Sequence, residues 1–125
     1  MIHHVSIGVR DLARARRFYD AAFGPLGFKM LNDFGETVGY GAEGARFWVS
    51  SVKKPVPPDP ESGLHICFEA KTRAAVDAFH AAAMGAGGKD NGKPGLRPDY
   101  GPSYYGAFVV DPDGYRVEAY CGKAS

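Results

Sequence analysis

An internal repeat is the feature of this 125-residue sequence that most constrains its fold. A shift that places His65 on His4 carries a strand, a helix and a glycine of the first half onto the same features of the second half. The further matched positions are Ile7 and Phe68, Asp11 and Thr72, Ala15 and Val76, Phe18 and Phe79, Ala22 and Ala83, and Gly27 and Gly88. Because every match has a structural rationale, the sequence predicts two similar modules.

Each module begins with a strand and continues into a helix. Residues 4–9 alternate between apolar side chains and polar or small ones, as in a half-buried strand. Asp11 predicts a helix start, because its carboxylate can accept from free amides of the first turn, and Gly24 and Pro25 predict the end. In the second half, residues 65–70 form the strand and Thr72 is the cap. The apolar stripes of the two helices are Leu12, Ala15, Phe18, Tyr19 and Ala22, and Val76, Phe79, Ala82 and Ala83.

Three shorter strands are expected after each helix. In the first half they lie near residues 28–31, 37–40 and 46–51. In the second half, the region 85–102 is rich in Gly, Pro, Asn and Asp, which indicates a weak strand and a long loop. Two clearer strands, 104–110 and 115–120, follow it.

The sequence therefore predicts an α+β fold made of two βαβββ modules. A proline-rich linker at 53–63 joins the first module, residues 1–52, to the second, residues 64–125. A single helix leaves one face of each four-stranded sheet bare, and that face needs a partner. Two such sheets placed edge to edge form a half-open curved barrel, so we expect one domain over 1–125 with a ligand on its inner face.

The composition excludes several classes of function. The 15 basic and 14 acidic residues leave a formal net charge of +1, which gives no electrostatic basis for nucleic-acid binding. The apolar runs are too short to cross a membrane, and the N-terminus has no secretory signal pattern. Cys67 and Cys121 lie in apolar strand-like runs and are expected to be buried free thiols, although neighbouring strands would also allow a disulfide. Together these features favour a cytoplasmic protein.

Three residues form a candidate metal site. His4 and His65 are related by the repeat, so a pseudo-twofold axis between the modules would bring their imidazoles together. Imidazoles suit Zn, Fe, Ni, Mn or Co, and an anionic third ligand would balance the charge of the ion. Glu118 lies in an apolar strand, where a carboxylate is costly unless it is paired or bound to a metal. The alternatives are histidines without a ligand role and a Glu118 that faces solvent on an edge strand.

Several segments resemble the vicinal oxygen chelate superfamily. The resemblance is carried by residues 4–12 (HVSIGVRDL), 17–19 (RFY) and 65–66 (HI), and by the DPDG turn that is followed by Glu118. This superfamily includes glyoxalase I, extradiol dioxygenases, fosfomycin-resistance proteins, bleomycin-binding proteins and methylmalonyl-CoA epimerases. The resemblance covers nearly the whole chain and implies a glyoxalase-like domain of paired βαβββ modules, commonly a homodimer. It also implies one divalent metal ion, with ligands at His4, His65 and Glu118.

One position departs from the pattern of glyoxalase I. When the last strands of the two halves are aligned, Glu118 coincides with Trp48, where glyoxalase I has a carboxylate. An indole neither binds a metal nor accepts a proton, so the site has three protein ligands, as in the fosfomycin-resistance and extradiol members. Trp48, Phe47 and Tyr40 are expected to form aromatic walls for a flat or apolar substrate.

The stretch 97–106 resembles a segment of a glyoxalase-like branch of the superfamily. Tyr105 could donate a proton or stabilise an oxyanion, as the catalytic partner of Glu118. Arg97 could bind an anionic group, and Tyr100 and Tyr104 are further candidates for substrate binding on this loop. The alternative is a packed aromatic lid with a surface arginine.

The leading hypothesis is a metal-dependent lyase or isomerase of the glyoxalase type. The metal would chelate two oxygens of a small oxygenated substrate and stabilise an enolate-like intermediate. One alternative is a ring-cleaving dioxygenase. The other is a metal-free protein that sequesters a drug or metabolite, as bleomycin-resistance members do. The expected partners are a small molecule and a second copy of the chain.

Overall fold

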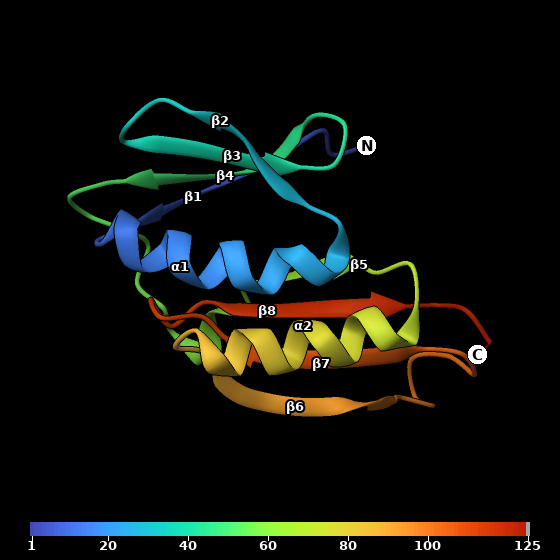
Figure 1. The fold of residues 1–125 in the computed structure, drawn as a ribbon. Coiled ribbons are helices and arrows are strands. Elements are labelled where there is room, and N and C mark those ends of the chain that lie inside the picture. The colour runs from blue at the N-terminus through green and yellow to red at the C-terminus, as the bar shows by residue number, and fades with distance from the viewer. Residues whose placement is uncertain (125) are drawn as a thin grey trace.

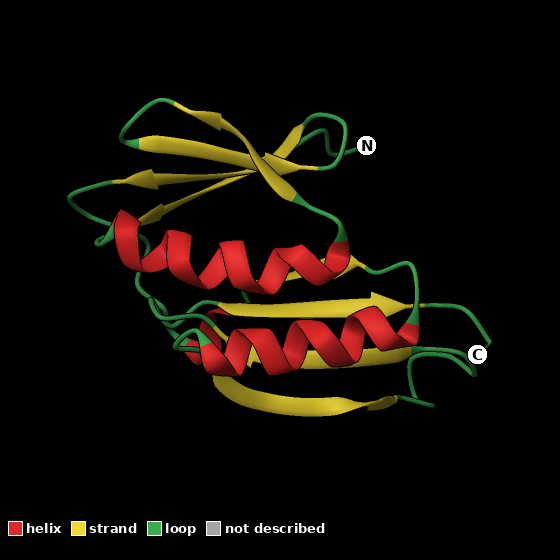
Figure 2. Ribbon diagram, viewed as in Figure 1, coloured by secondary structure: helices red, strands yellow, loops and turns green. Residues whose placement is uncertain are grey.

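The computed structural model describes residues 1–124, which form two four-stranded sheets and two long helices (Figures 1 and 2). Sheet A has the strand order β1 (Val5–Val9), β4 (Ala45–Ser51), β3 (Thr37–Gly41), β2 (Lys29–Asp33). Sheet B has the equivalent order β5 (His65–Glu69), β8 (Arg116–Cys121), β7 (Tyr105–Val110), β6 (Lys89–Leu96). The helices are α1 (Leu12–Phe23) and α2 (Arg73–Gly85), and short 3-10 turns lie at Gly24–Leu26 and Pro60–Ser62.

The two modules repeat the same topology. In each, the first strand runs parallel to the last, β1 beside β4 and β5 beside β8, and the other pairs are antiparallel. This confirms the α+β fold of two βαβββ modules that the repeat predicts. The two sheets are not closed into a barrel, consistent with a half-open curved fold. Within residues 1–124 they share no strand pair.

Both helices begin at the predicted caps. A carboxylate oxygen of Asp11 accepts from the backbone N–H of Arg14 at 3.1 Å, and the Thr72 hydroxyl accepts from the N–H of Ala75 at 3.0 Å. Each cap thus provides a partner for a first-turn amide that has none within its helix. None of the helices among the described residues is long and apolar enough to cross a membrane.

The region predicted as a weak strand and a long loop forms more strand than expected. β6 pairs with β7 over eight residues, Lys89–Leu96, although the register shifts on both sides of Gly92. Gly92 has φ 153° and lies against Phe108 of β7, where an added Cβ would come within 2.8 Å of the ring. The strand therefore depends on packing against β7 rather than on the low strand propensity of its own residues.

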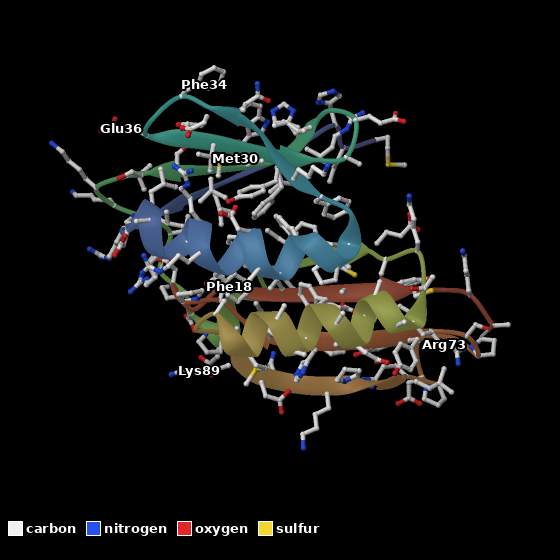
Figure 3. The ribbon with its side chains drawn as sticks, in the orientation of Figure 1. Phe18, Met30, Phe34, Glu36, Arg73 and Lys89 are labelled. Atoms are coloured by element: carbon white, nitrogen blue, oxygen red, sulfur yellow. The ribbon has the colours of Figure 1, made fainter. Side chains whose placement is uncertain are left out.

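The modules meet through their helices and share one hydrophobic core. α1 packs against α2, and Phe18 points from α1 toward α2 in Figure 3. Phe68 of β5 contacts two phenylalanines of the first module, with ring centroids 4.8 Å from Phe23 and 5.2 Å from Phe47. Because the helix-covered faces of both sheets line this common core, the opposite faces point away from it. We call these the open faces of sheets A and B.

The proline-rich linker is held against the second module and the end of β1. The Tyr115 hydroxyl lies 2.6 Å from the carbonyl oxygen of Val56 and 3.2 Å from that of Gly8. Gly114 has φ 97° and touches Pro58, where an added Cβ would come within 2.7 Å of the proline ring. The DPDG turn thus forms the surface on which the linker rests.

Candidate functional site

Glu118 is a buried carboxylate in the middle of sheet B. Its side chain is 3% exposed, and β8 lies between β5 and β7. The neighbouring Val117 and Ala119 point into the core, so strand alternation places Glu118 on the open face. This placement excludes the alternative of a solvent-facing residue on an edge strand. A carboxylate this deeply buried requires polar partners.

His65 is the first partner of this carboxylate. Its Nε2 lies 2.8 Å from Oε1 of Glu118, and its ring contacts Phe108 edge-on with centroids 5.7 Å apart. β5 runs parallel to β8 and places Cys67 opposite Glu118, so His65 reaches Glu118 from the start of the neighbouring strand. The His65 side chain is 34% exposed, which makes the pair accessible from the open face.

Tyr104 is the second partner of Glu118. Its hydroxyl donates to Oε2 of Glu118 at 2.5 Å, and its ring lies 4.3 Å from that of Tyr120. Burial and this hydrogen bond raise the pKa of Tyr104 above its ordinary value, so the phenol remains a donor at neutral pH. The sequence placed Tyr104 in a substrate-binding loop, but nothing in it indicated the contact with Glu118.

Cys67 lies on the same open face and was not predicted there. The prediction that both cysteines are buried is correct for Cys121, which is 1% exposed, and wrong for Cys67, which is exposed. Both are free thiols. Partial burial of the thiol and the negative charge of Glu118 raise the pKa of Cys67 to about 12. The alternation of β5 could have located it, because Cys67 follows His65 by two residues.

Arg97 and Tyr100 lie near this group. The Arg97 guanidinium sits 5.2 Å from the centre of the Phe108 ring and donates to the carbonyl oxygen of Lys93 at 2.6 Å. Tyr100 is 66% exposed and meets Tyr104 edge-on, with centroids 5.2 Å apart. Arg97 thus places a positive charge over the Phe108 ring, and the same ring contacts His65.

Tyr105 lies on the other side of sheet B. Its hydroxyl donates to Asp77 of α2 at 2.6 Å, and the Arg73 guanidinium lies 5.2 Å from its ring centre. The reason is strand alternation: Ala107 and Val109 of β7 face the core beneath α2, and Tyr105 shares their side. The structure therefore does not bring Tyr105 to Glu118.

His4 and Trp48 lie on sheet A. His4 is exposed, its Nδ1 is 2.8 Å from that of His3, and strand alternation places it on the open face, opposite the buried Val9 side. Trp48 lies on the same face and stacks on the exposed Phe34, with 6.2 Å between centroids and 7° between planes. Figure 3 shows Phe34 on the side of sheet A away from α1.

The structure separates the three residues that were predicted to form aromatic walls. Trp48 belongs to an open face, but Phe47 and Tyr40 are 4% and 1% exposed and pack in the core. Alternation along β4 explains the difference, because consecutive residues such as Phe47 and Trp48 must point to opposite faces. The Tyr40 hydroxyl donates to Asp20 of α1 at 2.8 Å, which satisfies it inside the first module.

The His65–Glu118 pair fits part of a metal site. Imidazole and carboxylate suit a divalent ion such as Zn, and metal–ligand bonds of about 2.0–2.2 Å allow one ion to touch two donor atoms that are 2.8 Å apart. The third predicted ligand lies elsewhere, because the open faces of the two sheets point away from their common core. Among residues 1–124 of one chain, no three His, Cys, Asp or Glu side chains are placed to hold a metal ion.

A cavity of about 460 Å³ lies apart from these residues, at the junction of the modules. Its apolar lining includes Leu26 and Phe28, and its charged lining comprises Glu69, Lys71 and Lys123. Glu118 and His65 do not line it, although Tyr120 does. Glu118 and His65 therefore lie on the open face of sheet B and not in this cavity.

Comparison with known proteins identifies the family. A model of the Glyoxalase/Bleomycin resistance protein/Dioxygenase superfamily matches residues 1–119. The chain belongs to this superfamily. A search of curated proteins gave no significant match.

Solved structures of the glyoxalase/bleomycin resistance protein/dioxygenase superfamily share the fold. A glyoxalase/bleomycin resistance protein from Albidiferax ferrireducens is 29% identical, with TM-score 0.79, and the match covers 94% of this chain and 95% of that one. A glyoxalase-related enzyme from Fulvimarina pelagi is 20% identical, with TM-score 0.75 and coverage of 97% and 87%. A fosfomycin resistance protein from Listeria monocytogenes is 15% identical, with TM-score 0.70 and coverage of 96% and 91%. The last two show the fold alone.

Proposed function

We propose that this protein is a metal-dependent lyase or isomerase that acts on a small oxygenated substrate. The observation that carries the proposal is the buried Glu118, whose Oε1 faces the Nε2 of His65 at 2.8 Å on the open face of sheet B. This carboxylate and the accessible imidazole beside it offer an oxygen donor and a nitrogen donor that together suit a divalent cation. Membership of the superfamily supports this interpretation.

The third ligand in this proposal is His4 of a second copy of the chain. His4 occupies on sheet A the position that His65 occupies on sheet B, and both open faces lack a covering helix from their own chain. A homodimer in which sheet A of one copy faces sheet B of the other would bring the three ligands together. This dimer would also cover both open faces, which no helix of the same chain covers.

The bound ion would polarise two substrate oxygens and stabilise the negative charge that develops on them. The residues of the chain bind and orient the substrate. Arg97, held over Phe108, provides a cation for an anionic substituent of the substrate. Trp48 of the facing sheet provides a flat apolar wall. Tyr105 has no part in the proposed reaction, because its hydroxyl is bound to Asp77 on the other side of the sheet.

Metal analysis tests the ligand set. Protein purified without a metal-affinity tag is loaded with Zn, dialysed, and analysed for metal per chain. We expect His4→Ala, His65→Ala and Glu118→Ala each to lose the metal. The matched control is His80→Ala, a histidine on α2 that pairs with Asp90 at 2.9 Å and should retain the metal. Unchanged metal content in all three ligand variants would mean that this set is not the site.

Turnover assays separate the reaction classes. Conversion of a hemithioacetal by the metal-loaded protein supports the lyase or isomerase proposal. Oxygen uptake with a catechol would instead indicate a ring-cleaving dioxygenase. Tight binding of an aromatic drug by the metal-free protein, without turnover, would indicate sequestration, for which the exposed Phe34–Trp48 stack offers a surface.

A further inference from the structure

The two oxygens of Glu118 have different partners. Oε1 lies 2.8 Å from Nε2 of His65, and Oε2 accepts from the Tyr104 hydroxyl at 2.5 Å. His65 belongs to β5 on one side of β8, and Tyr104 immediately precedes β7 on the other side. The carboxylate is therefore held from both neighbouring strands, with one oxygen toward the histidine and the other toward the phenol.

Contacts independent of Glu118 fix the position of Tyr104. Its carbonyl oxygen accepts from the N–H of Arg97 at 2.8 Å, which closes the loop that precedes β7. Its ring also contacts those of Tyr100 and Tyr120, with 5.2 and 4.3 Å between centroids. The phenol is thus preorganised by the loop and by two aromatic neighbours.

Gly106 makes room for the hydrogen bond between Tyr104 and Glu118. A Cβ added to Gly106 would lie 3.0 Å from Oε2 of Glu118 and 3.2 Å from the Tyr104 ring. Both distances are shorter than ordinary van der Waals contact. A side chain at this position would push the carboxylate and the phenol, so glycine permits the hydrogen bond between them.

We propose that Tyr104 is a positioning residue that occupies Oε2 of Glu118 and leaves only Oε1 free to bind the metal. This inference rests on the proposed metal site. Residues that hydrogen-bond to a metal ligand fix its orientation, and their loss commonly weakens metal binding. Because Glu118 then binds through one oxygen, the coordination position that its second oxygen would fill stays available for the substrate.

Cobalt binding by the Tyr104→Phe variant tests this inference without any assay of activity. Protein is titrated with Co(II), and the visible absorption bands and the dissociation constant are recorded. Without the phenol hydroxyl, Glu118 is free to turn, so we expect changed Co(II) bands and a dissociation constant raised about tenfold. The matched control is Tyr105→Phe, which removes the neighbouring hydroxyl from a different carboxylate, Asp77, on the opposite side of the sheet. It should match the wild type in both measurements.

A second variant, in β7, disturbs the same hydrogen bond between Tyr104 and Glu118. Gly106→Ala keeps both partners and separates them, so we expect it to shift the Co(II) bands in the same direction, even if Tyr104→Phe fails to fold. Wild-type bands and affinity in both variants would overturn the role of Tyr104 while leaving the metal site intact. Failure of the wild-type protein to bind Co(II) would overturn the proposed function and this inference with it.

Discussion

At the scale of single residues, the best-satisfied buried polar group outside the candidate site is Asp111. One carboxylate oxygen accepts from the backbone N–H groups of Asp113 and Tyr115 at 2.9 and 2.8 Å, and the other accepts from the Tyr19 hydroxyl at 2.6 Å. Tyr19 is 1% exposed and Asp111 is 3% exposed. These bonds fix the turn before β8, and therefore the strand that carries Glu118, to α1 of the other module.

Tyr19→Phe should lower the free energy of unfolding by about 1–3 kcal/mol, because one oxygen of a buried carboxylate loses its partner. Denaturant titration of the metal-free protein measures this loss. The control is Tyr100→Phe, whose residue is 66% exposed and should change stability by less than about 0.5 kcal/mol. Equal stabilities of the two variants would show that the Tyr19–Asp111 bond adds nothing to the fold.

Asp111 also predicts a specific dependence of stability on pH. Burial raises the pKa of Asp111, although the hydrogen bonds from Tyr19 and Tyr115 oppose the increase. With a raised pKa, the native state binds the proton more tightly than the unfolded chain does. The contribution of Asp111 to stability is then full below the unfolded pKa of about 3.9 and is lost as the pH rises through the native pKa.

Asp111→Asn removes this titration and keeps a side-chain acceptor. We therefore expect the stability of the variant, relative to wild type, to increase as the pH rises through the native pKa of Asp111. Unfolding free energies measured at a series of pH values from acid to neutral provide the comparison. A constant difference between the two proteins would mean that the pKa of Asp111 is not raised by folding.

At the scale of elements, strand alternation decides which side chains belong to the site. β4 places Trp48 on the open face of sheet A, and Gly39 of β3 is its cross-strand neighbour. An added Cβ at Gly39 would come within 2.8 Å of the indole and 2.9 Å of the Ala45 Cβ. The indole can take this position because residue 39 is a glycine and has no side chain.

Gly39→Ala should displace the indole from Phe34 and destabilise the protein by about 1–3 kcal/mol through overpacking. Trp48 is the single tryptophan of the sequence, so the intrinsic fluorescence spectrum reports on this position directly. Gly44→Ala in the loop before β4 is the matched control, because a Cβ there meets nothing within 4 Å. An emission spectrum identical to wild type in Gly39→Ala would contradict the predicted displacement.

The elements that sequence predicts well are those with local signals. Asp11 and Thr72 mark their helices because a cap acts on amides within one turn. β6 was underestimated because its pairing depends on Phe108, a residue far along the chain, which local propensity cannot represent. The placement of Tyr105 was missed for a related reason: its side of the sheet depends on the register of β7, and a one-residue shift reverses every side chain.

At the scale of the whole molecule, the repeat predicted two equivalent modules, and their bare sheet faces led us to expect the two sheets edge to edge. Contact through helices and contact through sheet edges both cover apolar surface. The structure joins α1 to α2 and inserts Phe68 among the phenylalanines of the first module. As a result, His4 and His65 occupy equivalent places that do not converge in one chain.

Mixing two variants that each lack one proposed metal ligand tests whether the site is shared between copies. His4→Ala retains His65 and Glu118, whereas Glu118→Ala retains His4. If the site is shared, an equal mixture that is unfolded and refolded together should recover about a quarter of the wild-type metal content, since half of the dimers are mixed and each has one intact site. Neither variant alone should recover any. If all three ligands act within one chain, the mixture will also bind no metal.

The common core has a consequence for how the two modules stay associated. Phe68 of the second module contacts both Phe23 and Phe47 of the first, so each module covers part of the other's aromatic surface. A single βαβββ unit would need a second molecule to cover the same surface. The proline-rich linker makes the association of the two modules intramolecular, so the two halves of the core stay together at any protein concentration.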